Sequence, residues 1–160
     1  MISVKKNFSE IAARFEFHEG CRLMPYYDHL GKLTIGIGRC IDTNPFNTAE
    51  LKAIGDWRHG ITRNAALMLL RNDVQKCLEK LKKLDFFAEL DDERQYALLD
   101  MCFQLGFEGL LEFKKMLEAI RRGRFNDAAA ECLRSKYAKQ TPKRARRIAR
   151  VIREGIWSRE

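Results

Sequence analysis

The sequence has few prolines, few histidines and no long hydrophobic run. It contains three prolines and three histidines. A membrane-spanning helix needs about 20 consecutive, mostly apolar residues, and no stretch of this chain approaches that. The N-terminal residues Met-Ile-Ser-Val-Lys-Lys-Asn-Phe lack the apolar centre of a signal peptide. We therefore expect no membrane insertion and no export signal.

Residues that bind metals or nucleotides are also sparse. The five cysteines form no Cys-x-x-Cys pair and the histidines are isolated, so no zinc site is expected. Gly36-Ile37-Gly38 follows a predicted strand, but Ile41 replaces the third glycine of a dinucleotide fingerprint. We expect no cofactor. The odd number of cysteines indicates free thiols in a protein made in a reducing compartment.

The chain is long enough for one domain, and it carries an excess of positive charge. It contains 160 residues, with a net charge of +8 and a pI near 9.4. A strongly basic protein favours an anionic partner, either nucleic acid or an anionic cell-wall polymer. Much of this charge lies in one C-terminal run: Lys136, Lys139, Lys143, Arg144, Arg146, Arg147, Arg150 and Arg153.

Hydrophobic spacing predicts a mainly helical α+β fold. Apolar residues in steps of three and four predict a helix over 62–84, capped by Thr62, which spans roughly 30 Å. Before it we expect an N-terminal helix opened by a capping box of Asn7 and Glu10, a β-hairpin and a short helix over 48–54. After it we expect helices from Asp91 or Asp92 to Gly106, over 109–121, over 124–134, and from Thr141-Pro142 to about Glu154, the last with Ala145, Ile148, Ile152 and Ile156 inward.

Glu19 is the first candidate catalytic residue. The apolar stripe of the N-terminal helix includes Phe8, Ile11, Ala12 and Phe15, and the next position on it is Glu19, immediately before Gly20. A carboxylate at the edge of a core and at the negative end of a helix is expected to have a raised pKa, as a general acid needs. The alternative is a helix-end glutamate that points into solvent.

Asp28 and Thr34 follow on a predicted hairpin. Asp28 opens a turn over 28–32, and a strand over 33–37 follows it. Alternation places Leu33, Ile35 and Ile37 on one face, with Thr34 and Gly36 on the other. There the hydroxyl would stand beside a glycine that leaves room for a ligand. Taken singly, the aspartate is also an ordinary turn residue and the threonine an ordinary strand residue.

Six ordered segments carry a family resemblance. They are Glu-Gly-Cys-Arg-Leu (19–23), Tyr-Tyr-Asp (26–28), Leu-Thr-Ile-Gly-Ile-Gly (33–38), Phe-Gln-Leu-Gly (103–106), Gln-Thr-Pro-Lys-Arg-Ala (140–145) and Gly-Ile-Trp (155–157). The set resembles the T-even-type phage lysozymes, glycoside hydrolase family 24. The resemblance implies catalytic roles for Glu19, Asp28 and Thr34, substrate contacts for Phe103 and Gln104, and an Arg144 that supports Glu19.

The resemblance also implies the lysozyme-like arrangement of the chain. Within a single domain over 1–160, we expect a β-containing lobe over about 14–61. A helical lobe would comprise 85–160 together with the N-terminal helix, and helix 62–84 would link the two. A polysaccharide cleft is expected between the lobes.

The implied activity is that of an endolysin. Such an enzyme hydrolyses the β-1,4 bond between N-acetylmuramic acid and N-acetylglucosamine in peptidoglycan, and we expect inversion at the anomeric carbon. A lytic transglycosylase acting on the same bond is the nearest alternative. A basic nucleic-acid- or wall-binding module without turnover is the alternative from another class, but it leaves Glu19, Asp28 and Thr34 unexplained. We expect a monomer that stays in the bacterial cytoplasm until lysis, binds no nucleic acid, and needs a separate membrane-permeabilising protein for its release.

The chain departs from the family pattern at several positions. Relatives often have a histidine after Gly-Ile-Gly, paired with an aspartate on the long helix, and here Arg39 and Asp73 stand at those positions. We expect these two residues to form an ion pair without the pH response of histidine. Met116 and Glu131 occupy two further positions where relatives often contact saccharide.

Overall fold

The computed structural model describes residues 1–160, which form a mainly helical α+β fold with one small antiparallel sheet. This confirms the fold class expected from the hydrophobic spacing. The chain divides into two compact units, one of Val4–Gln75 and the other of Met1–Ser3 with Lys76–Glu160. The N-terminal helix belongs to the same unit as the sheet, whereas we expected it with the helical lobe. No helix is long and apolar enough to cross a membrane.

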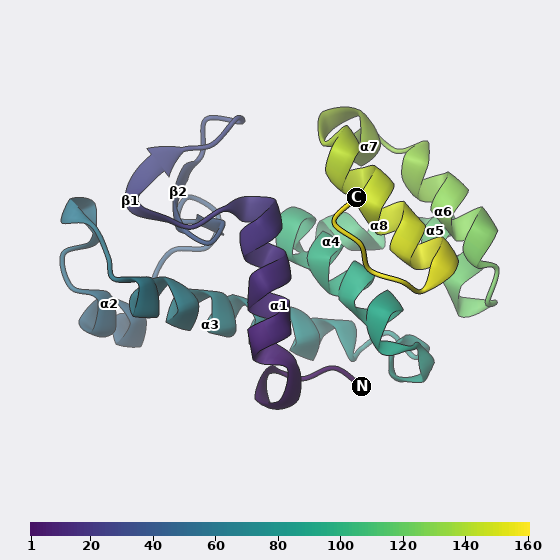
Figure 1. The fold of residues 1–160 in the computed structure, drawn as a ribbon, viewed down its shortest axis with the longest axis horizontal. Helices are drawn as coiled ribbons and strands as arrows, with labels where there is room; N and C mark the ends of the chain where they lie inside the picture. The colour runs from purple at the N-terminus through teal and green to yellow at the C-terminus, as the bar shows by residue number, and fades with distance from the viewer. The chain divides into compact units, whose positions relative to one another are not determined.

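The unit of residues 4–75 contains the sheet and its covering helices. The three strands are hydrogen-bonded in the order β1-β2-β3, and a core of apolar side chains centred on Ile35 and Leu69 packs between β2 and α3. The elements of this unit are labelled in part in Figure 1 and run in the order α1 (Val4–Glu19), β1 (Arg22–Tyr27), β2 (Leu33–Gly36), β3 (Arg39–Cys40), α2 (Thr48–Ile54), η1 (Trp57–His59) and the first part of α3 (Arg63–Leu81).

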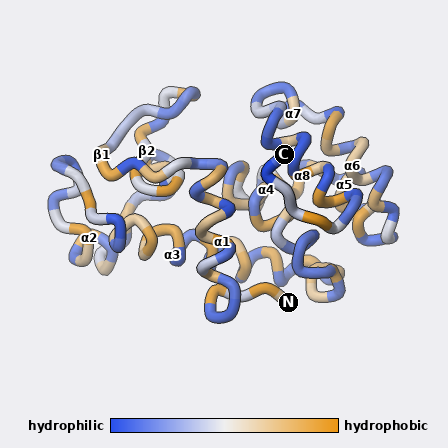
Figure 2. Tube along the Cα trace, in the orientation of Figure 1, coloured by the Kyte–Doolittle hydropathy of each residue, from blue (hydrophilic) through white to orange (hydrophobic).

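The other unit is a bundle of helices around α8. This last helix packs against α4, α6 and α7, and hydrophilic and hydrophobic residues alternate along it in short stretches (Figure 2). Its inward residues Ala145, Ile148 and Ile152 are buried as expected, but Ile156 is 62% exposed because the helix has already ended. The elements are η2 (Phe87–Glu89), α4 (Asp92–Leu111), α5 (Lys114–Arg121), α6 (Phe125–Leu133), α7 (Lys136–Gln140) and α8 (Pro142–Glu154).

Helix starts test the capping predictions. Thr62 Oγ1 accepts a hydrogen bond from the Ala65 amide at 3.0 Å, and Asp91 caps α4, as expected. The predicted capping box at Asn7 is wrong, because α1 begins at Val4 and Asn7 lies inside it. A complete capping box instead joins Asn47 and Glu50 at the start of α2.

The C-terminal helices also differ from expectation at their boundaries. The helical backbone of α4 is interrupted at Gly106 as expected, because its φ of 77° and ψ of 160° are not helical. A second helical stretch continues to Leu111 and α5 begins only at Lys114, whereas we expected one helix over 109–121. Helix α7 was not predicted. Pro142 is at the start of α8 as expected, but the Thr141 side chain does not cap the helix, because its hydroxyl donates to the Tyr137 carbonyl instead.

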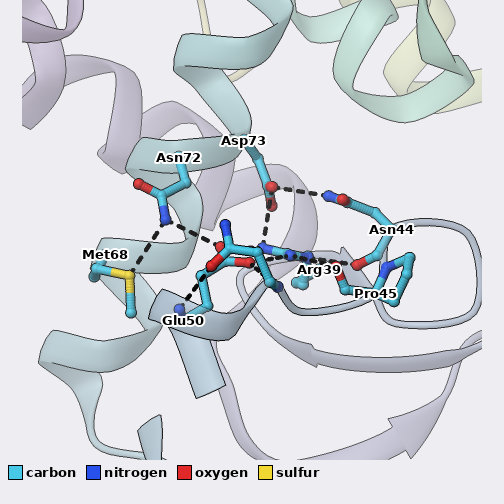
Figure 3. Close-up of polar contacts among 8 residues, drawn as sticks. Arg39, Asn44, Pro45, Glu50, Met68, Asn72 and Asp73 are labelled. Carbon is cyan, nitrogen blue, oxygen red and sulfur yellow. Dashed lines mark hydrogen bonds and ion pairs between the residues drawn. The ribbon is translucent and has the colours of Figure 1, made fainter. Parts of the chain in front are cut away.

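Arg39 and Glu50 are the most buried charged side chains of the sheet-bearing unit, each 1% exposed, and Figure 3 shows the partners of Arg39. Its Nη1 lies 3.1 Å from Asp73 Oδ1, so the expected pair is confirmed. Glu50, which we did not predict as a partner, accepts two further hydrogen bonds from the guanidinium at 2.7 and 2.9 Å. The Asn44 carbonyl accepts from Nε at 2.8 Å. The guanidinium therefore joins β3 to α2, to α3 and to the loop between β3 and α2.

The hydrogen bonds of this cluster change the pKa of Glu50. Although burial opposes ionisation, hydrogen bonds from Arg39, Asn72 and the Asn47 amide lower the pKa of Glu50 from 4.5 to about 2. A carboxylate whose pKa is lowered on folding stabilises the fold fully above its unfolded pKa. That contribution is lost as the pH falls from about 4.5 towards about 2.

We predict that Glu50→Gln lowers the free energy of unfolding by roughly 3 kcal/mol at neutral pH, because it leaves buried Arg39 without its main counter-charge. Glutamine keeps the capping geometry, so the loss reports the charge. Denaturant unfolding of wild type and variant at several pH values tests this, with Glu108→Gln, a change at an exposed glutamate, as control. A stability difference that stays constant below pH 4.5 would contradict the assignment.

Candidate active site

Glu19 is the last residue of α1, and Gly20 ends the helix as predicted. Gly20 has φ 72°, and its amide donates to the Glu16 carbonyl at 2.7 Å. The last turn is also tied to the start of α3, because Arg63 donates two hydrogen bonds of 2.8 Å to the Glu16 carboxylate. The main chain that carries Glu19 is therefore held at a defined place.

The Glu19 side chain lies against Gly38, in the turn between β2 and β3. A β-carbon at Gly38 would be 2.8 Å from Cγ and Cδ of Glu19 and 2.9 Å from Oε2. The half-buried glutamate thus directs its carboxyl group at the sheet rather than away from it. This excludes the alternative of a helix-end glutamate that points freely into solvent.

Asp28 opens the turn between β1 and β2, as predicted. Its Oδ1 accepts hydrogen bonds from the amides of Leu30 and Lys32, both at 2.9 Å, and its own amide donates to the Lys32 carbonyl at 2.9 Å. These bonds fix the carboxylate through one oxygen. The other oxygen, Oδ2, remains available to an incoming molecule.

Thr34 lies in the middle of the sheet, opposite Tyr26 on β1 and Cys40 on β3. Directly opposed residues in an antiparallel sheet share a face. The threonine is 4% exposed, and its hydroxyl donates to the Lys32 carbonyl at 2.9 Å, so its oxygen can still accept a bond.

The role that we expected for Gly36 is wrong. A β-carbon at Gly36 would touch Ala66 Cβ at 3.4 Å, so this glycine faces the apolar core instead of leaving room for a ligand. Its φ of 68° breaks the alternation of the strand.

Tyr26 brings the two carboxylates into one site. Burial raises the pKa of Tyr26, and the negative charges of Glu19 and Asp28 raise it further, against the lowering effect of Arg22. The Arg22 guanidinium carbon lies 3.9 Å from the centre of the tyrosine ring. Both carboxylates therefore act on one phenol, which stands directly opposite Thr34.

The other three predicted residues lie in the helical unit. Phe103 and Gln104 are half-buried on α4, just before the kink at Gly106. Gln104 Nε2 donates to Thr141 Oγ1 at 3.3 Å, while its Oε1 is buried without a hydrogen-bond partner. An unsatisfied acceptor of this kind is costly unless a ligand supplies a donor.

Arg144 is held by a buried carboxylate of α4. Its Nε donates to Asp100 Oδ1 at 2.9 Å, and Tyr96 donates to the other oxygen of Asp100 at 3.1 Å. Asp100 is fully buried and was missed, although a charged residue inside an apolar helix already indicates a buried partner. The contact of Arg144 with Glu19 that the family resemblance implies stays a prediction.

A pocket of about 600 Å³ opens in the same unit between the start of α5 and the helices α6 and α7. Met116 and Glu131, the two positions noted from the sequence, both line it. Leu105 and Phe113 contribute apolar surface, and the positive charges come from Lys114, Lys115, Arg134 and Lys136.

Comparison with known sequences gives the family. The profile of the family described as phage lysozyme matches residues 16–150. The chain belongs to the phage lysozyme family. It is 29% identical over 162 residues to probable T4-type lysozyme 2 of Dictyostelium discoideum, covering 92% of this chain and 95% of that protein. Probable T4-type lysozyme 1 of the same organism is also 29% identical, over 163 residues, with the same coverage.

A third relative has a different overall organisation. The chain is 32% identical over 151 residues to the pre-baseplate central spike protein Gp5 of Enterobacteria phage T4, a match that covers 86% of this chain and 26% of that protein. The family and the two lysozyme relatives identify the chain as a lysozyme-type glycoside hydrolase.

Two residues of the lysozyme site were not predicted, Tyr26 and Gly38. Both were within the segments that carry the resemblance, but their importance depends on contacts between strands and α1. Tyr26 could have been found by pairing the two predicted strands across their turn, which places it opposite Thr34. Gly38 carries no local signal that distinguishes it from Gly36.

We predict that Glu19→Gln and Asp28→Asn each lower the pKa of Tyr26, because each removes a negative charge that opposes formation of the tyrosinate. NMR titration of protein labelled at the tyrosine ring carbon tests this, and Tyr27, 72% exposed, serves as internal control. A Tyr26 titration that is unchanged in Asp28→Asn would mean that the two carboxylates do not share a site.

Proposed function

We propose that this lysozyme hydrolyses the β-1,4 bond between N-acetylmuramic acid and N-acetylglucosamine in peptidoglycan, with inversion of configuration. The observation that carries the proposal is that Glu19 lies against Gly38 in the β2–β3 turn, while Asp28 is fixed in the β1–β2 turn of the same sheet. Glycosidases cleave such bonds with a pair of carboxyl groups, one on each side of the scissile bond. The family and its two lysozyme relatives support the choice of substrate.

Glu19 is the proton donor in this mechanism. Protonated Glu19 gives its proton to the glycosidic oxygen, which leaves as an alcohol while positive charge develops on the sugar ring. Its place at the end of α1, with the carboxyl group directed at the sheet next to Gly38, supports this role.

Asp28 and Thr34 hold the water that attacks the opposite face of the sugar. The Asp28 carboxylate, with Oδ1 bound to two amides, presents Oδ2 to one hydrogen of the water. The Thr34 hydroxyl, which donates to Lys32, accepts the other hydrogen. The water lone pair is then directed at the anomeric carbon, and Asp28 takes the released proton. An inverting pair needs a separation of roughly 6.5–9.5 Å to admit this water.

Residues of the helical unit bind the polymer. Gln104 Oε1 is buried without a partner and suits an amide or hydroxyl donor of the sugar, and Phe103 offers a ring to a sugar face. The pocket lined by Met116 and Glu131 has room for part of the polymer. Its cations Lys114, Lys115 and Lys136 suit the carboxylates of the wall peptides. Arg144, held by Asp100, has the supporting role that the family resemblance implies.

The biological setting belongs to the proposal. We infer a monomeric endolysin that stays in the bacterial cytoplasm until a separate protein permeabilises the membrane. All five cysteines are free thiols, which fits a reducing compartment. The basic surface would draw the released enzyme to the anionic wall.

The first test separates hydrolysis from transglycosylation. Glu19→Gln should abolish lysis of a cell-wall suspension, because no other group donates the proton; Glu10→Gln, on the exposed side of the same helix, should not. Asp28→Ala should also stop a hydrolase, whereas a transglycosylase needs only the acid. Reducing ends in the digest support hydrolysis; anhydro ends, with activity retained in Asp28→Ala, would establish the transglycosylase instead.

The second test is the configuration of the product. Because the water attacks the face opposite the leaving group, we predict that the first product formed from the β-linked substrate is the α-anomer. Proton NMR early in the digestion of soluble peptidoglycan fragments measures this before mutarotation. An initial β-anomer would show retention and would assign Asp28 a nucleophilic role.

A further inference from the structure

Gly38 lies directly against the side chain of Glu19 and has no assigned role of its own. A side chain there would enter the volume that Glu19 occupies, with its first carbon 2.8 Å from Cγ and Cδ. Real β-carbons do not come so close to other heavy atoms. The carboxyl group of Glu19 therefore rests on bare main chain.

The turn that presents Gly38 is rigid on both sides. Ile37 before it is 2% exposed, and Arg39 after it is 1% exposed and held by Glu50 and Asp73. Moving this turn would disturb the apolar core or a buried ion cluster, and both are costly. The Glu19 side chain, in contrast, is half-buried and ends in a flexible carboxyl group. A methyl group added at residue 38 would thus displace Glu19 and leave the turn in place.

We propose that Gly38 is a positioning residue for catalysis: its missing side chain forms the niche that holds the Glu19 carboxyl group in line with the scissile bond. The inference rests on the proposed role of Glu19 as proton donor. Proton transfer depends steeply on placement, and a displacement of about 1 Å can reduce the rate by about 100-fold. The shape of the niche is therefore expected to affect the rate of the chemical step and not the affinity for substrate.

A matched control separates this effect from backbone strain. Gly38 has φ 72°, a conformation that alanine adopts only with strain. Gly55, in the same unit, has φ 69°, and a side chain there would meet no atom within 4 Å. Gly38→Ala and Gly55→Ala therefore both place an alanine at positive φ, but only Gly38→Ala brings a methyl group against Glu19.

The experiment compares wild type, Gly38→Ala and Gly55→Ala. We measure kcat and KM on soluble peptidoglycan fragments at a temperature at which the proteins are folded, together with Tm and the titration of Tyr26. Gly38→Ala should lower kcat at least about tenfold with little change in KM, and it should shift the Tyr26 titration because the neighbouring carboxylate has moved. Gly55→Ala should lower Tm and retain the wild-type kcat and Tyr26 titration.

Three results would overturn the proposal. Equal kcat values for the two alanine variants would show that Gly38 meets only a backbone requirement. A fall in kcat with an unchanged Tyr26 titration would place the effect elsewhere than at Glu19. If Gly38→Ala fails to fold while Gly55→Ala folds, the added methyl group disrupts the turn instead of displacing the Glu19 side chain. Glu19→Gln, assayed alongside, tests the proposed function itself: if that variant retains activity, the proposed function is wrong.

Discussion

A buried guanidinium is the constraint on which the sheet-bearing unit depends. Arg39 is 1% exposed, and a charge so deep in the protein is tolerated only when its donors are satisfied. Glu50, Asp73 and two loop carbonyls satisfy them, and these groups come from α2, α3 and the segment between β3 and α2. The cluster therefore fixes the end of the sheet against two helices. Because Gly38 immediately precedes the arginine, the same cluster fixes the main chain on which the Glu19 carboxyl group rests.

A second buried ion pair has a similar position in the helical unit. Asp100 is fully buried between Tyr96 and Arg144, and it directs the guanidinium from the first turn of α8. A cation in that turn interacts unfavourably with the helix dipole. The negative charge of Asp100 offsets this interaction. In both units, then, an arginine next to or within a segment of the family signature is held by a buried carboxylate that the signature does not contain.

Local signals predicted most elements of this fold, and the misses have tertiary causes. Thr62 and Asp91 were identifiable because a cap depends on residues three or four apart, and the Asp28 turn because aspartate binds its own main chain. Glu50 was not identified as the partner of Arg39, since nothing in the chain between them indicates the contact. Asn7 and Glu10 have the spacing of a capping box, yet the helix starts earlier. Gly36 and Gly38 look alike in sequence, and only packing assigns one to the core and the other to the site.

The two proposed catalytic carboxylates differ in how they are held, and this explains why an arginine suits residue 39. Asp28 is fixed by its own turn, which needs no distant partner. Glu19 rests on main chain that is kept in place by an ion cluster. The position of its carboxyl group would therefore change if a member of that cluster lost its charge. A histidine there would lose its charge above a pKa of about 6.5, whereas Arg39 stays charged. With the pKa of Glu50 at about 2, the pair of Arg39 and Glu50 remains ionised at every pH above about 4.5. Protonation of Glu50 therefore does not disturb the main chain beside Glu19 above that pH.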